Sequence, residues 1–136
     1  MKNKLLLLVF LVLCAASVKI YGQAADTSQV VLNPEKKAEF SGGVNAWIKF
    51  LEKNLDRDLM YKKSAPRGSY KVLGSFLVDT LGQVIDIKIE LDPGYGAADE
   101  FIRVLKLSSK KWIPAYDNGK AVLFRHRQSL TLVQNF

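Results

Sequence analysis

Few residues of this chain combine the type and the spacing that catalysis or metal binding requires. The only histidine, His126, stands between Arg125 and Arg127 and has no cysteine partner with which to hold a metal ion. Ser129 follows three residues later, but residues three apart on a strand point to opposite faces, so no Ser–His pair is expected. We interpret His126 as a surface or edge residue and predict no bound metal.

Two pairs of carboxylates are the remaining candidates for acid–base chemistry. Asp86 and Glu90 lie on the polar face of a predicted strand, where charges are expected. Asp99 and Glu100 fall in the first turn of a predicted helix, where negative charge favours the helix dipole. The turn at residues 94–96 lacks the longer glycine pattern of a phosphate-binding loop. We therefore predict that the protein is not an enzyme and has no cofactor, no catalytic residues and no small-molecule substrate.

Basic residues gather near the end of the predicted second helix and along the predicted last strand. Lysines complement the dipole at a helix C-terminus, and charges guard an edge strand against aggregation, but the same residues could contact an acidic partner. The chain carries a net charge of +7. Without three N-terminal lysines, 17 basic residues would face 13 acidic ones, too small an excess to favour nucleic-acid binding. The basic set comprises Lys106, Lys110, Lys111, Lys120, Arg125 and Arg127.

Residues 111–120 join the predicted second helix to the last strand. Trp112 supplies a large apolar anchor, and Pro114 prevents the helix from continuing. Asn118 and Gly119 tolerate the positive φ angles of a tight turn. We predict that these four residues support and position the last strand.

Hydrophobic periodicity indicates the helices that accompany this joint. A helix of about 12 residues should begin after Ser41, its plausible N-cap, with Phe40 as a hydrophobic staple. One face of this helix is apolar at Val44, Trp47, Ile48, Leu51 and Leu55. A second apolar helical face runs from Ala98 to Leu105.

The strands are indicated by a different periodicity. The segment from Tyr70 to Asp79 is apolar at most positions, as in a central strand that is buried on both faces. After a turn at 79–82, apolar residues alternate with charged ones from Ile85 to Leu91, which is typical of a half-buried strand. The last strand is expected over residues 121–133.

The order helix-strand-strand-helix-strand predicts an α+β fold over residues 40–136. Crossover rules place the first strand at the centre of a three-stranded antiparallel-plus-parallel sheet with two helices on one face. The last strand then lies at an edge and offers unpaired N–H and C=O groups to another chain. Residues 23–39 are predicted to be a short linker or disordered start.

The first 22 residues have the layout of a cleaved secretory signal peptide. Lys2 and Lys4 precede an apolar run over residues 5–18, which is shorter than the ~20 residues that a spanning helix needs. A retained membrane anchor stays an alternative. Cys14, the only cysteine, lies inside the run, so the mature chain would form no internal disulfide.

Several short motifs occur in a fixed order along residues 40–136. They are Phe40-Ser41-Gly42-Gly43, Lys71–Asp79, Gly82, Asp99-Glu100 with Arg103, Lys111-Trp112-Ile113-Pro114 and Asn118-Gly119-Lys120. In this order and spacing the chain resembles the C-terminal domain of TonB, the energy transducer of Gram-negative envelopes, most closely in the versions from Bacteroidota.

The resemblance implies a periplasmic protein-binding module that takes part in TonB-dependent transport. Such a module adds the extended N-terminal segment of an outer-membrane receptor, or of a similar protein, to its last strand. Arg125 and Arg127 would steer an acidic partner. Two alternatives stay open, a short membrane-anchored energy transducer and a self-associating module that forms a homodimer. The predicted pairing residues are Val122, Leu123, Phe124, Arg125, His126, Arg127 and Gln128.

Overall fold

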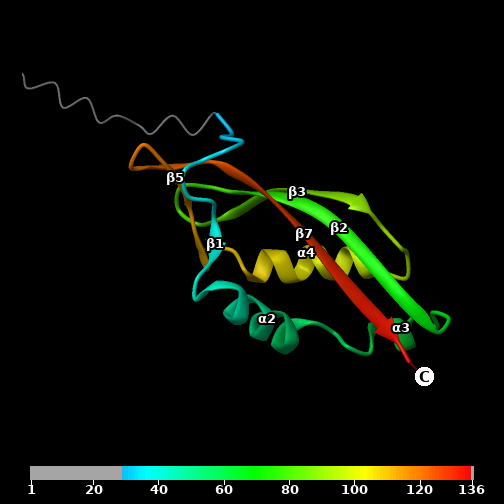
Figure 1. Cartoon of the computed structure of the whole chain (residues 1–136). Coiled ribbons are helices and arrows are strands. Elements are labelled where there is room, and N and C mark those ends of the chain that lie inside the picture. The colour runs from blue at the N-terminus through cyan, green and yellow to red at the C-terminus, as the bar shows by residue number, and fades with distance from the viewer. Residues whose placement is uncertain (1–28, 136) are drawn as a thin grey trace, which may run out of the picture.

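The computed structural model describes residues 29–135, which form a mixed α+β domain (Figure 1). The predicted signal peptide, Cys14 and the first part of the predicted linker lie outside the described residues, as does Phe136. Within the described part of the chain, no helix is both long and apolar enough to cross a membrane.

The main sheet has the strand order β3-β2-β7. Its central strand β2 (Gly68–Val78) pairs antiparallel with β3 (Val84–Leu91) on one side and with β7 (Phe124–Gln134) on the other. The predicted central and edge positions are therefore confirmed. The sheet is antiparallel throughout rather than antiparallel-plus-parallel, because the two outer strands run the same way but each pairs only with β2.

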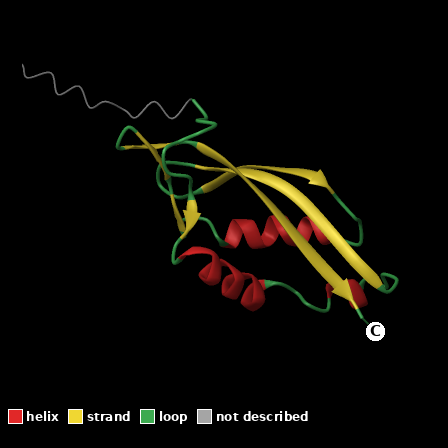
Figure 2. Cartoon of the chain, in the orientation of Figure 1, coloured by secondary structure: helices red, strands yellow, loops and turns green. Residues whose placement is uncertain are grey.

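The helices lie on one side of this sheet (Figure 2). They are α2 (Gly43–Asn54), the short α3 (Leu59–Lys62) and α4 (Ala97–Leu107). From β2, the fully buried Val72, Phe76 and Val78 join the core, to which α4 contributes Phe101 and Leu105. The opposite face of β2 is also covered, since Ser75 and Leu77 are buried. This double burial explains why the strand is apolar at successive positions.

Strand β3 departs from the predicted alternation because it contains a bulge. Asp86 has a φ of 47°, and the register with β2 shifts between Ser75 and Leu77. The bulge turns Ile85 outward, where 41% of the residue is exposed, and Leu91 is also exposed. Only Ile87 and Ile89 of the predicted apolar set pack against the core.

The start of α2 also differs from the prediction. Ser41 does not cap the helix; the cap position is Gly42, in a left-handed conformation, and no side chain accepts its first N–H groups. The backbone can enter the helix in this way because Gly42 and Gly43 tolerate φ angles of 88° and 77°. Phe40 does contact the helix, with its ring 5.1 Å from that of Trp47.

Four short strands build the joint between α4 and β7. They are β1 (Glu39–Phe40), which pairs with β4 (Trp112–Ile113), and β5 (Ala115–Asp117), which pairs with β6 (Lys120–Val122). Asn118 and Gly119 connect β5 to β6 with φ angles of 48° and 73°, which confirms the predicted tight turn.

The described part of the predicted linker is attached to this joint. The Lys36 and Tyr116 backbones exchange two hydrogen bonds of 3.0 and 2.8 Å. Farther toward the N-terminus, the N–H of Val31 donates to the carbonyl of Leu123 over 2.9 Å. Val31 and Lys36 are thus attached to the domain through their backbone groups.

Candidate functional site

The outer side of β7 is a free sheet edge. Strand β7 pairs with β2 along its whole length, and within residues 29–135 no strand of this sheet pairs with its other side. The free edge begins after Leu123, whose carbonyl is occupied by Val31. Of the seven predicted pairing residues, Val122 belongs to β6 and Leu123 to the occupied position, whereas the other five lie in β7.

Helix α2 lies alongside this edge, so that β7 runs between β2 and α2 (Figure 1). Two hollows of about 440 and 290 Å³ separate α2 from β7 and share Ile48 and Leu51 in their walls. We call them together the α2–β7 groove. Trp47 and His126 line its first part, and residues 130–133 of β7 line its second part.

The apolar face of α2 is only partly used by the core. Trp47 is buried, and Leu51 and Leu55 pack against the core from partly exposed positions. Val44 and Ile48 are 74% and 46% exposed on the wall of the groove. The sequence displayed this apolar face but could not indicate which part of it lacks a partner within the domain.

His126 lies on the edge strand, as predicted, but its ring is half-buried on the helix side. The ring centroid is 5.0 Å from that of Trp112 and 5.3 Å from that of Phe76. Burial lowers the pKa of His126, and a hydrogen bond with Gln128 opposes this effect. The neutral imidazole therefore packs with these aromatic rings and forms part of the wall of the α2–β7 groove.

One polar group in this wall has no partner. The indole Nε1 of Trp47 is buried and makes no hydrogen bond among the described residues. A buried donor without an acceptor costs about 1–3 kcal/mol.

Arg125 and Arg127 point to the opposite face of the sheet and cross β2 to reach carboxylates of β3. Arg125 pairs with Asp86, and Arg127 donates from Nε to Glu90 over 2.8 Å. The hydrogen bond from Arg125 lowers the pKa of Asp86. Both guanidinium charges are thus matched within the sheet, and their predicted role in steering a partner stays a prediction.

Trp112 occupies the centre of the joint. It is buried, and its Nε1 donates to the Ser108 hydroxyl over 3.0 Å. Its ring lies 5.3 Å from that of Trp47 and 5.1 Å from that of Phe76, so it links α2 to the sheet. Pro114, half-buried, separates β4 from β5. The position of Trp112 is consistent with the supporting role that the sequence predicted.

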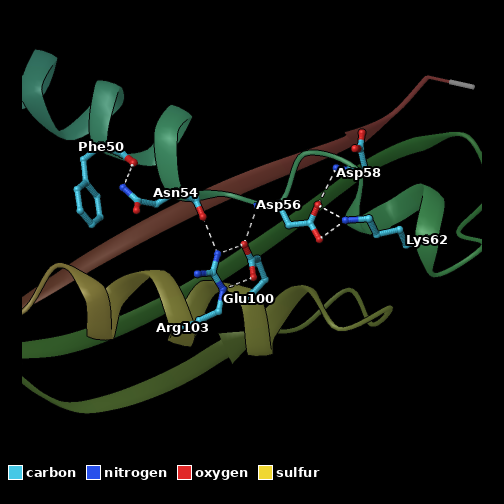
Figure 3. Close-up of polar contacts among 7 residues, drawn as sticks. All are labelled: Phe50, Asn54, Asp56, Asp58, Lys62, Glu100 and Arg103. Atoms are coloured by element: carbon cyan, nitrogen blue, oxygen red, sulfur yellow. Dashed lines mark hydrogen bonds and ion pairs between the residues drawn. The ribbon is translucent and has the colours of Figure 1, made fainter.

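The carboxylates singled out in the sequence have structural partners. Glu100, with a side chain only 8% exposed, accepts hydrogen bonds from Arg103 over 2.7 and 2.6 Å and from the N–H of Asp56 over 2.8 Å (Figure 3). Arg103 also donates to the carbonyl of Asn54 over 2.6 Å, at the end of α2. The hydrogen bonds from Arg103 lower the pKa of Glu100. This network attaches α4 to the segment after α2; Asp99 is exposed.

Within residues 29–135, no three His, Cys, Asp or Glu residues come together in a way that could hold a metal ion. The chain matches no family model, no curated protein and no solved structure.

Proposed function

We propose that this protein is a protein-binding module that adds an extended segment of a partner to the free edge of β7. The observation that carries the proposal is the combination of an unpaired strand edge with an apolar groove beside it. Strand addition derives its affinity from main-chain hydrogen bonds and its specificity from pockets for alternate side chains. The edge supplies the first requirement, and the α2–β7 groove supplies the second.

The geometry also limits where the added segment can lie. Because Val31 occupies the carbonyl of Leu123, the segment pairs with β7 beyond that residue. Alternate side chains of an added strand project toward the helix side, where Val44 and Ile48 are exposed. The partner segment should therefore carry apolar side chains at alternate positions.

The resemblance to the TonB C-terminal domain supplies the partner class. We propose that the partner is the N-terminal segment of a TonB-dependent outer-membrane receptor, or of a similar protein, and that binding takes place in the periplasm after removal of a signal peptide. The order of the helices and long strands and the edge position of the last strand support this assignment.

The test measures the affinity for fluorescently labelled receptor N-terminal peptides by anisotropy. A Val44→Ser/Ile48→Ser variant should bind roughly tenfold more weakly or worse, because two apolar contacts are lost. A Tyr61→Ser/Leu81→Ser variant is the matched control, since these residues are 66% and 73% exposed outside the groove. Equal affinities of the two variants would overturn the proposed site.

Two further measurements address the alternatives. Sedimentation of the protein alone tests self-association, and a concentration-dependent dimer that excludes the peptides would favour the structural module. Sequencing of the mature N-terminus tests the anchor, because an intact Met1 would favour the membrane-anchored transducer.

A further inference from the structure

Helix α2 borders a further hollow on the flank that faces away from the α2–β7 groove. Residues of a helix advance by about 100° each, which places Lys49 and Lys53 roughly opposite Val44 and Ile48. Lys110 and Lys111, which follow α4, complete the rim of a hollow of about 690 Å³. We call this site, defined by the four lysines, the lysine hollow.

The lysine hollow concentrates positive charge without matching negative charge. No Asp or Glu lines it, and within residues 29–135 none of its four lysines forms an ion pair. The basic residues that the sequence grouped together therefore separate in space. Lys110 and Lys111 border α2, whereas Arg125 and Arg127 are paired on the far face of the sheet.

Lys53, in the last turn of α2, and the two lysines after α4 complement helix dipoles, but two local features of the set are unfavourable. Lys49 and Lys53 are four residues apart on α2, a spacing at which like charges repel. Lys110 has a φ of 67°, a conformation in which glycine or asparagine is preferred. Unfavourable local choices that persist in a fold are expected at functional sites.

The backbone that carries Lys110 and Lys111 is held on both sides. The N–H of Lys110 donates to the carbonyl of Gly82 over 2.9 Å, and the carbonyl of Lys111 accepts from Ser41 over 2.9 Å. The lysine pair is thereby fixed opposite α2, and the hollow is set by the fold rather than by mobile side chains alone.

We propose that the lysine hollow binds an acidic segment of a protein partner, at a site separate from the β7 edge. Carboxylates of the segment would pair with the lysine ammonium groups at the rim, and an apolar side chain would cover the ring of Phe50 on the floor. Asn54 donates its side-chain N–H to the backbone carbonyl of Phe50 over 2.7 Å, which leaves its amide oxygen to accept a backbone N–H. Lysines beside the partly exposed ring of Phe50 suit a peptide segment that carries both carboxylates and an apolar side chain.

The test uses the whole protein and a labelled peptide of four Glu and two Phe residues, with affinity measured by anisotropy. Lys49→Gln/Lys53→Gln and Lys110→Asn/Lys111→Gln variants should each bind about three- to thirtyfold more weakly. A Lys106→Gln/Lys120→Gln control, with the same change in net charge outside the hollow, should bind as the original protein does. Asparagine is chosen at position 110 because it tolerates positive φ, and circular dichroism of each variant verifies folding.

Two outcomes would overturn the inference. Equal weakening in the control variant would show that the peptide responds to net charge and not to the hollow. The second outcome concerns vesicles of anionic phospholipid. If the protein bound such vesicles, and both hollow variants lost this vesicle binding and kept peptide binding, the site would be assigned to a membrane. The Val44→Ser/Ile48→Ser variant should retain peptide binding in the hollow, so failure of this inference and failure of the β7 site are distinguishable.

Discussion

Gly82 offers a test of how the joint between α4 and β7 is held in place. A Cβ atom added at Gly82 would lie 2.1 Å from the carbonyl oxygen of Trp112. Gly119 provides a matched control, because its φ of 73° is close to the 75° of Gly82, yet an added Cβ would meet nothing within 4 Å. Gly82→Ala and Gly119→Ala therefore share the conformational cost and differ in the close approach.

The expected magnitudes follow from this difference. Left-handed backbone costs an alanine about 1–2 kcal/mol relative to glycine, and this is the whole effect expected at Gly119. At Gly82 the two backbone segments must separate by more than about 1 Å to reach an ordinary C···O contact. That movement should break the hydrogen bond from Lys110 to Gly82, at about 1 kcal/mol, and disturb core packing around Trp112, at about 1–3 kcal/mol. Gly82→Ala should thus cost about 2–4 kcal/mol more than Gly119→Ala.

Urea unfolding followed by tryptophan fluorescence measures this difference, since both tryptophans of the chain, Trp47 and Trp112, lie in the affected core. The comparison holds only if the two variants keep the same dependence on urea concentration. If their free energies of unfolding agree within about 1 kcal/mol, the close approach of Gly82 to Trp112 is refuted. Weakened peptide binding by Gly82→Ala is also expected, because Trp112 lines the α2–β7 groove.

Three further predictions concern polar groups. Glu100→Gln should lower the free energy of unfolding by about 1–2 kcal/mol near neutral pH. The effect stays this small because Arg103 is half-exposed, and solvent weakens its ion pair with Glu100. The pKa of Glu100 is lowered in the folded state, so its ionised form stabilises the protein above the unfolded pKa near 4.3. Urea unfolding at a series of pH values should show this contribution disappear as the pH falls through the folded pKa. His126 also has a lowered pKa, so stability should fall as pH drops below about 6.5, and His126→Gln should flatten this dependence. Ser108→Ala should cost about 1–3 kcal/mol in thermal or urea unfolding, because it leaves the buried N–H of Trp112 without an acceptor; a change below about 0.5 kcal/mol would contradict this.

Local patterns were sufficient to predict the order of elements and the position of β2. A strand that is apolar on both faces is usually a central one, and β2 lies between β3 and β7. The turn at Asn118 and Gly119 was likewise predictable, because few residue pairs tolerate positive φ at both positions. These features depend on residues that are close in sequence.

The features that were missed depend on residues far apart in sequence. The alternation from Ile85 to Leu91 could not reveal that Asp86 bulges and turns to meet Arg125, 39 residues away. The helical period of α2 identified its apolar face, but the exposure of Val44 follows from where β7 lies. The lysine hollow was equally hidden, since it joins α2 to a segment after α4.

The two edges of the main sheet are protected to different degrees, and this difference bears on function. Edge strands are commonly shielded from pairing by bulges, by lysine and by proline. Strand β3 has a bulge at Asp86 and a lysine at position 88. Strand β7 contains neither lysine nor proline, and its two arginines are drawn across the sheet to Asp86 and Glu90. The sheet therefore blocks one edge and leaves the other open beside an apolar groove. An edge without a binding role would gain protection from aggregation by acquiring a single lysine, so the open state of β7 favours strand addition as its role.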